Sequence, residues 1–187
     1  METFFISKYK LTALLVFLTL SGNGFCVSHS NKTFDIFSLN KLLAKTINIG
    51  YTIEANCGNH VHDLSITDLT KIKQAGFTAV RLPIGWVTAM AGDSSFTVDP
   101  EFLKKIDLLV KSAVQLHLAV IIDNQADEQL MNQPEQFKTR FLLLWRQLSM
   151  HYKAYPQQVM FEIMAEPHGN LEKFWNIYLR YALTIVR

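Results

Sequence analysis

An apolar run ends in a carboxylate, and proline and glycine follow it at once, in Val159-Met160-Phe161-Glu162-Ile163-Met164-Ala165-Glu166-Pro167-His168-Gly169. This order is typical of a buried parallel strand that delivers one acid, here Glu166, to the rim of a sheet. A carboxylate at such a rim is suited to act as a general acid, because partial burial can raise the pKa of a carboxylic acid towards working pH. The stretch therefore predicts an α/β fold with a candidate catalytic acid at a strand end.

Apolar spacing in the rest of the chain alternates between the period of strands and the period of helices. The predicted strands are 46–50, 77–83, 118–123 and 159–166, and the predicted helices are 66–75, 101–117, 134–153 and 170–185. About four such units predict a parallel sheet with a helix after each strand. Two closures fit this pattern: an open doubly wound sheet, and half of a (β/α)8 barrel, whose full length is typically about 250 residues.

Composition and charge narrow the class of function. The 187 residues suit one domain or part of a larger one, with 49% hydrophobic and 18% charged residues. A formal net charge of +2 is too small to argue for nucleic acid or an anionic membrane as a partner. The segment 50–54 departs from the G-x-G-x-x-G pattern, which disfavours dinucleotide binding. His60 and His62 have no further ligands to complete a set, so the sequence predicts no metal site and no cofactor.

The first 28 residues have the pattern of a secretory signal. Lys8 and Lys10 precede the apolar run 11–20, and small and polar residues follow it. This run is too short to span a bilayer comfortably. We therefore expect a signal peptide over 1–28, a lead-in segment over 29–45 and a secreted or periplasmic protein, with an uncleaved anchor as the alternative.

Polar side chains gather where the predicted strands end, and in a (β/α)8 barrel the active site lies at that face. They are Asn48, Glu54, Arg81, Asp123, Gln125, Glu166 and His168. Arg81 stands within an apolar strand, where an unpaired charge would be costly. We therefore expect Arg81 to pair with a carboxylate, either Glu162 or Glu166.

Glu162 and Glu166 do not look like the two acids of a glycosidase. On one straight strand they would be about 13 Å apart, at about 3.3 Å per residue. A retaining pair lies at about 5–5.5 Å and an inverting pair at about 6.5–9.5 Å. A partner acid for Glu166 must therefore come from another strand, and Asp123 and Asp127 are the nearby candidates.

Several of these segments together resemble glycoside hydrolase family 5, the cellulase family. The segment 46–50, followed by Glu54, resembles the opening strand of that family, and 75–86 resembles its second strand. The segment 161–169 resembles its fourth-strand Asn-Glu-Pro motif, and 137–156 is similar to its third helix and the turn after it. Because several motifs occur in the right order, the resemblance is specific.

The resemblance, which runs over 46–187, implies a (β/α)8 barrel of which about the first four βα units are present. It also implies retaining hydrolysis of β-linked glucans or mannans, with a polysaccharide or oligosaccharide as partner. Glu166 matches the acid/base carboxylate, and Arg81 matches the arginine that organises the nucleophile. The implied substrate contacts are Glu54, Trp86, Gln125 and His168. Trp86 could stack on a sugar ring, and a packing role fits it equally well.

Some family positions are altered in this sequence. The family's Asn before the acid/base is Ala165 here, which removes a contact that normally reaches the sugar 2-hydroxyl. The His pair expected after the third strand appears as Gln125-Ala126, and Asp127 stands where an aromatic residue is expected. Losing these groups removes substrate contacts and part of the electrostatic preorganisation. The resemblance therefore implies impaired catalysis.

The nucleophilic Glu that the family carries on its seventh strand has no counterpart up to Arg187. We therefore expect a truncated glycosidase, such as the first part of a split gene. The alternatives are a catalytically inactive pseudoenzyme or glycan-binding fragment, and a decaying gene product without a stable fold. Because half a barrel leaves two open parallel edges, self-association through these edges is also expected.

Overall fold

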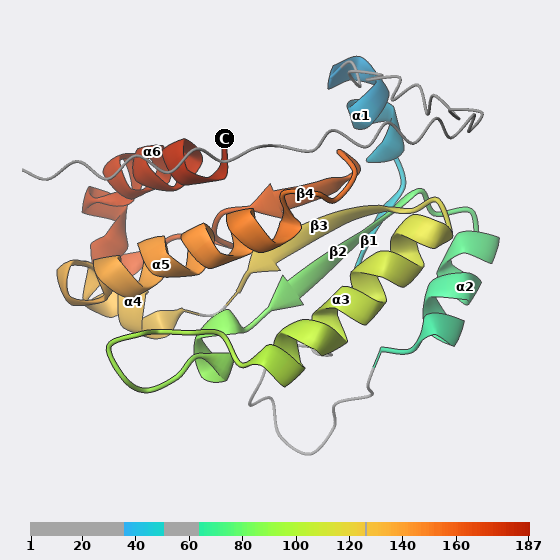
Figure 1. The fold of residues 1–187 in the computed structure, drawn as a ribbon. Coiled ribbons are helices and arrows are strands. Elements are labelled where there is room, and N and C mark those ends of the chain that lie inside the picture. Colours follow the sequence, from blue (N-terminus) through green and yellow to red (C-terminus); the bar gives the residue numbers. More distant parts are fainter. Residues whose placement is uncertain (1–35, 51–63, 126) are drawn as a thin grey trace, which may run out of the picture. The chain divides into compact units, whose positions relative to one another are not determined.

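A four-stranded, all-parallel sheet lies at the centre of the structure (Figure 1). The computed structural model describes residues 36–50, 64–125 and 127–187. The strands are β1 (Thr46–Asn48), β2 (Ala79–Ile84), β3 (Ala119–Asn124) and β4 (Val159–Glu162). Their spatial order is β1-β2-β3-β4. A doubly wound sheet would reverse its order at a switch point, so this order excludes that closure and confirms the (β/α)8 type of fold.

Helices connect the strands, and Figure 1 shows α3 and α5 crossing the same face of the sheet. The α-helices are α1 (Ile36–Leu42), α2 (Ile66–Gln74), α3 (Pro100–Gln115), α4 (Glu128–Asn132), α5 (Pro134–Tyr152) and α6 (Trp175–Val186). Two 3₁₀ helices, η1 (Trp86–Ala89) and η2 (Gly169–Lys173), follow the carboxyl ends of β2 and β4. None of the helices in the described part of the chain is long and apolar enough to cross a membrane.

Local capping explains why the predicted helices α2 and α3 begin where they do. Ser65 accepts a hydrogen bond from the Asp68 N–H, and the Asp68 carboxylate accepts one from the Ser65 N–H, which forms a capping box. Asp99 accepts a hydrogen bond of 2.7 Å from the Phe102 N–H, and Pro100 occupies the first position of α3. Both signals are local, so the sequence reveals them directly.

The strand register divides the sheet into a helix-covered face and a second face, which we call the polar face because Arg81, Asp123 and Glu162 point from it. Five side chains on the covered face are fully buried: Val80, Leu82, Ile84, Val120 and Ile122. Side chains alternate along a strand, and directly paired residues point to the same face. Arg81 pairs with Ile121, and Asp123 pairs with Glu162. Arg81, Asp123 and Glu162 therefore point together from the polar face.

The structure corrects the predicted boundaries at the end of the sheet. Strand β4 ends at Glu162 rather than at Glu166, because the chain bends over the following residues. The last helix, expected from residue 170, begins only at Trp175, and Asn170 lies before it, where its Nδ2 donates to the Asn132 carbonyl oxygen at 2.9 Å. The short helices α1 and α4 were not predicted. Residues 1–28, and with them the expected signal peptide, lie outside the described residues.

Candidate active site

Arg81 joins side chains from all four strands at the carboxyl end of the sheet. Its Nε and Nη2 donate to the two oxygens of Glu162 at 2.7 and 3.0 Å. Nη2 also donates to Asp123 Oδ2 at 2.9 Å, and Nη1 donates to Asn48 Oδ1 at 2.7 Å. We call Asn48, Arg81, Asp123 and Glu162 the Arg81 network. The sequence leaves Glu162 and Glu166 as possible partners for Arg81, and the structure shows that Arg81 binds Glu162.

The Arg81 network places two carboxylates on one guanidinium. The fork-like contact with Glu162 is the strong, bidentate type of ion pair. The hydrogen bonds to Glu162 raise the pKa of Arg81, and the Asp123 charge acts in the same direction, so the guanidinium stays charged. Asp123 has a fully buried side chain and needs this positive neighbour. The network therefore links the four strands and places one positive and two negative charges at the carboxyl end of the sheet.

Glu166 lies in the bend after β4, four residues beyond Glu162, and its side chain is exposed. The partial burial that the sequence suggested is not found. Its φ of 46° lies in the left-handed region, which is costly for a residue with a Cβ and is seen mostly where neighbouring contacts hold the backbone. The Ala165 N–H just before it donates to the Asn124 carbonyl at 3.0 Å. Because the chain bends here, the separation of about 13 Å expected for a straight strand does not apply.

His168 supports the same bend from the other side. Its ring Nδ1 lies 2.8 Å from the Glu166 carbonyl oxygen, and because a carbonyl only accepts, this contact requires the proton on Nδ1. The His168 N–H donates to the Met131 sulfur at 3.4 Å, and Nε2 lies 3.8 Å from the Glu128 carboxylate on α4. His168 is exposed, and the contact of its ring with the Glu166 carbonyl places this predicted residue directly beside Glu166.

The other predicted substrate contacts are Trp86, Gln125 and Glu54, and the structure does not place all of them where a ligand at the carboxyl end of the sheet could reach them. Trp86 is fully buried: its Nε1 donates to the Asp123 carbonyl at 3.2 Å, and its ring meets Phe102 edge to face at 5.9 Å. This corrects the suggestion that Trp86 stacks on a sugar, because a buried ring offers no face to a ligand. Gln125 is half-buried, and its N–H extends the ladder by donating to the Ile84 carbonyl at 3.0 Å. Glu54 lies outside the described residues.

A second buried ion pair, which the sequence argument missed, holds the connection after β3. Arg140 on α5 contacts the Asp127 carboxylate at 2.5 Å, and Asp127 also caps α4 by accepting from the Leu130 N–H at 3.0 Å. Burial raises the pKa of Asp127, and the positive charge of Arg140 opposes that rise. The available signal was an arginine on the apolar face of a predicted helix, beside Phe137 and Phe141. Asp127 is thus engaged with Arg140 and does not serve as a partner acid for Glu166.

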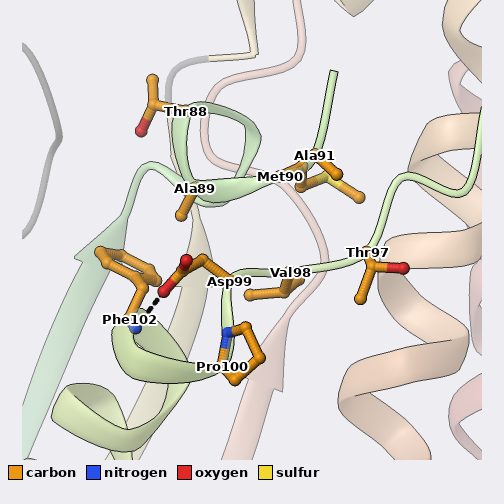
Figure 2. A pocket seen from close by; sticks show the side chains of 9 residues that line it. All are labelled: Thr88, Ala89, Met90, Ala91, Thr97, Val98, Asp99, Pro100 and Phe102. Atoms are coloured by element: carbon orange, nitrogen blue, oxygen red, sulfur yellow. Dashed lines mark hydrogen bonds between the residues drawn. The ribbon is translucent and has the colours of Figure 1, made fainter. Parts of the chain in front are cut away.

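A cavity of about 520 Å³ lies in the connection between β2 and α3, separate from the Arg81 network. Figure 2 shows its lining, which is mostly apolar, with Met90, Val98 and Phe102 among the residues drawn. The Asp99 carboxylate in this lining is already engaged by the Phe102 N–H, as the dashed line in Figure 2 marks. None of the four residues of the Arg81 network lines this cavity. This cavity is therefore not part of the candidate active site at the carboxyl end of the sheet.

Comparison with known proteins agrees with this geometry. A family model described as cellulase (glycosyl hydrolase family 5) matches residues 46–187. The chain belongs to glycosyl hydrolase family 5. Among the described residues of this family 5 chain, no three His, Cys, Asp or Glu side chains are grouped so that they could hold a metal ion.

Relatives of the chain are endoglucanases. Endoglucanase H of Acetivibrio thermocellus is 27% identical over 145 residues, which cover 77% of this chain and 16% of that protein. Endoglucanase 1 of Ruminococcus albus is 26% identical over 155 residues, 75% of this chain and 38% of that protein. The crystal structure of endoglucanase Cel5A from Thermotoga maritima superposes with a TM-score of 0.78 at 41% identity, over 82% of this chain and 50% of that one. The chain thus spans half or less of the length of these relatives.

Proposed function

We propose that this family 5 chain recognises β-linked glucan or mannan at the carboxyl end of its sheet and that Glu166 serves as the acid/base for retaining hydrolysis. The observation that carries the proposal is the Arg81 network, which gathers one polar side chain from each strand at the rim where Glu166 is exposed. The Thermotoga maritima Cel5A structures described in complex with mannotriose and with cellobiose support this class of ligand.

In this proposal Glu166 gives a proton to the glycosidic oxygen and later takes one from the attacking water. A retaining reaction also needs a second carboxylate at about 5–5.5 Å as nucleophile. Asp123 does not fit that role because its side chain is fully buried, and Glu162 does not fit because both of its oxygens already accept hydrogen bonds from Arg81. Arginine has five N–H donors, and the four hydrogen bonds of Arg81 to described residues leave one Nη1 hydrogen for a further acceptor. That hydrogen suits a nucleophilic carboxylate from outside the described residues.

The alternative is a protein that binds glycans and does not cleave them. Ala165 is buried directly before Glu166, and its methyl group offers no hydrogen bond to a sugar hydroxyl. Removing one donor that stabilises developing charge typically slows catalysis about 10²–10³-fold. We therefore propose that any hydrolysis by this chain is impaired, and that binding without turnover is the second candidate.

We also propose export of the chain and association between copies. The basic residues and apolar run of the first 28 residues support export, and cell fractionation with N-terminal sequencing tests it. Among the described residues, β1 pairs only with β2 and β4 only with β3, so each outer strand leaves backbone groups for another strand. Sedimentation at several protein concentrations tests association: a monomer at every concentration would overturn it.

The deciding experiment measures reducing sugar released from soluble β-glucan and β-mannan, together with calorimetric binding of cellobiose and mannotriose. Glu166→Gln should abolish release, and Glu172→Gln, a matched change at an exposed position on η2, should not. Release that persists in Glu166→Gln would contradict the role of Glu166. Binding without release favours the second candidate, and absence of both contradicts the proposed function.

A further inference from the structure

A polar cavity of about 380 Å³ opens between the α4–α5 turn and η2, at the same end of the sheet as Glu166. We call it the amide pocket, because four of its lining residues carry side-chain amides. Its lining consists of Asn132, Gln133, Pro134, Glu135, Gln136, Asn170, Lys173 and Phe174. The Arg81 network and Glu166 contribute nothing to this lining, so the pocket is separate from the candidate active site.

Two walls of the amide pocket are fixed by contacts between η2 and α4. Asn170 Nδ2 donates to the Asn132 carbonyl at 2.9 Å, and Asn132 Nδ2 donates to the Glu128 carbonyl at 2.9 Å. Gly169 has a φ of 62°, and a Cβ there would lie 3.3 Å from the Met131 carbonyl oxygen. Glycine therefore allows η2 to lie close against α4, which keeps Asn132 and Asn170 in contact with each other in the lining of the pocket.

The remaining polar groups of the pocket are available to a ligand. Each asparagine Nδ2 uses one of its two hydrogens in these contacts, which leaves the second hydrogen as a donor and the Oδ1 atom as an acceptor. The side chains of Gln133 and Gln136 are exposed and make no hydrogen bond to other described residues. Each of these amides can donate and accept at the same time. Phe174 adds a half-buried aromatic ring to the lining.

This combination favours an uncharged ligand that is rich in hydroxyl groups. Vicinal hydroxyls match the paired donor and acceptor of an amide, and a sugar ring also has C–H faces that pack on an aromatic ring. Glu135 and Lys173 carry opposite charges, so the lining has no net attraction for an anion or a cation. A volume near the lower end of the range for ligand pockets, about 300–1,000 Å³, suits a short saccharide.

We propose that the amide pocket is a second saccharide-binding site, which holds one or two sugar units of the same β-linked polysaccharide away from Glu166. The class of sugar rests on the proposed function, whereas the preference for a neutral polyhydroxylated ligand rests on the lining alone. Because the side chains are exposed and must be ordered on binding, the site is weak and serves to keep a long substrate close to the rim.

Nuclear magnetic resonance of the ¹⁵N-labelled full chain tests the pocket directly. Cellobiose and mannotriose are added separately, and the side-chain amide signals of Asn132, Gln133, Gln136 and Asn170 are followed. These signals should shift with saturation, both in the unaltered chain and in Glu166→Gln. Gln136→Ala should weaken the affinity about three- to tenfold, the loss expected for one neutral hydrogen bond. Gln74→Ala, at an exposed position on α2, is the matched control and should leave the affinity unchanged.

The outcomes separate this inference from the proposed function. If the pocket signals do not move with either sugar, or if Gln136→Ala binds as well as Gln74→Ala, the amide pocket is not a saccharide site. Equal shifts with inorganic phosphate would also overturn it, because they would indicate an anion site at Lys173. Pocket shifts without any sugar release support the second site while leaving the role of Glu166 unsupported. Sugar release without pocket shifts would support the proposed function and contradict the second saccharide site.

Discussion

Replacing Arg140 by methionine tests the buried ion pair that holds the connection between β3 and α4. Arg140→Met keeps an unbranched apolar stem against Phe137 and removes the guanidinium from Asp127. Both charged groups lie out of solvent, with side-chain exposures of 7% for Arg140 and 1% for Asp127. Removing one partner of a buried pair costs about 3–5 kcal/mol. We therefore expect the free energy of unfolding to fall by about that amount near neutral pH.

The loss of stability should shrink in acid, because Asp127 can take up a proton. Burial raises the pKa of Asp127 above its ordinary value of 3.8, and Arg140 opposes that rise. Without Arg140 the folded-state pKa moves further upward. A carboxyl group whose pKa is higher in the folded state binds more protons when folded, so its contribution to stability falls as pH rises from the unfolded pKa through the folded pKa. Arg140→Met should therefore lose less stability at about pH 4 than at about pH 7.

Urea unfolding followed by circular dichroism at both pH values measures this difference. Arg180→Met, at an exposed position on α6, is the matched control and should change stability by less than about 0.5 kcal/mol. The double variant Arg140→Met with Asp127→Asn removes both charges and keeps an oxygen for the Leu130 N–H, so it should recover most of the loss. A loss under about 1 kcal/mol for Arg140→Met, or a double variant no more stable than the single one, would refute the reasoning.

Three further changes give separate tests. Arg81→Lys keeps the charge but not the planar fork that binds Glu162, so the free energy of unfolding in urea should fall by about 1–3 kcal/mol. An unchanged urea midpoint would contradict a structural role for the network. Ser65→Ala removes the cap of α2 and should cost about 1 kcal/mol in the same assay; a loss below about 0.3 kcal/mol would contradict the capping account. Glu166→Gly relieves the left-handed φ of 46° and should raise the thermal midpoint while it abolishes any sugar release, whereas Glu172→Gly should do neither.

The sequence predicted the regular elements well where the signals are local. Helix α3 was expected at 101–117 and lies at Pro100–Gln115. Its start was predictable because Asp99 and Pro100 are typical of a helix N-cap and first turn. The five-residue helix α4 is too short to show an apolar period, so nothing in the sequence spacing announced it.

The end of β4 was missed for a different reason. The residues between Glu162 and Glu166 are apolar and continue the look of a strand, but the ladder with β3 ends where Asp123 pairs with Glu162. The neighbouring strand therefore sets where β4 ends. Glycine is the residue that usually signals a left-handed φ, so the sequence does not reveal the left-handed backbone at Glu166. The cost of a buried charge predicts that Arg81 has a carboxylate partner, but it does not choose between Glu162 and Glu166. The strand register makes that choice, because it places Glu162 beside Arg81.

The two ion pairs together explain how the end of β3 is held in place. Asp123 is bound by Arg81 on the polar face, and Asp127, four residues later, is bound by Arg140 on the side of the helices. Gln125 lies between these two fixed points, and its N–H is bonded to β2. The position of this residue is therefore set by charges that do not depend on its own side chain. A change of side chain at Gln125 can therefore alter the groups offered to a ligand while the surrounding backbone keeps its shape.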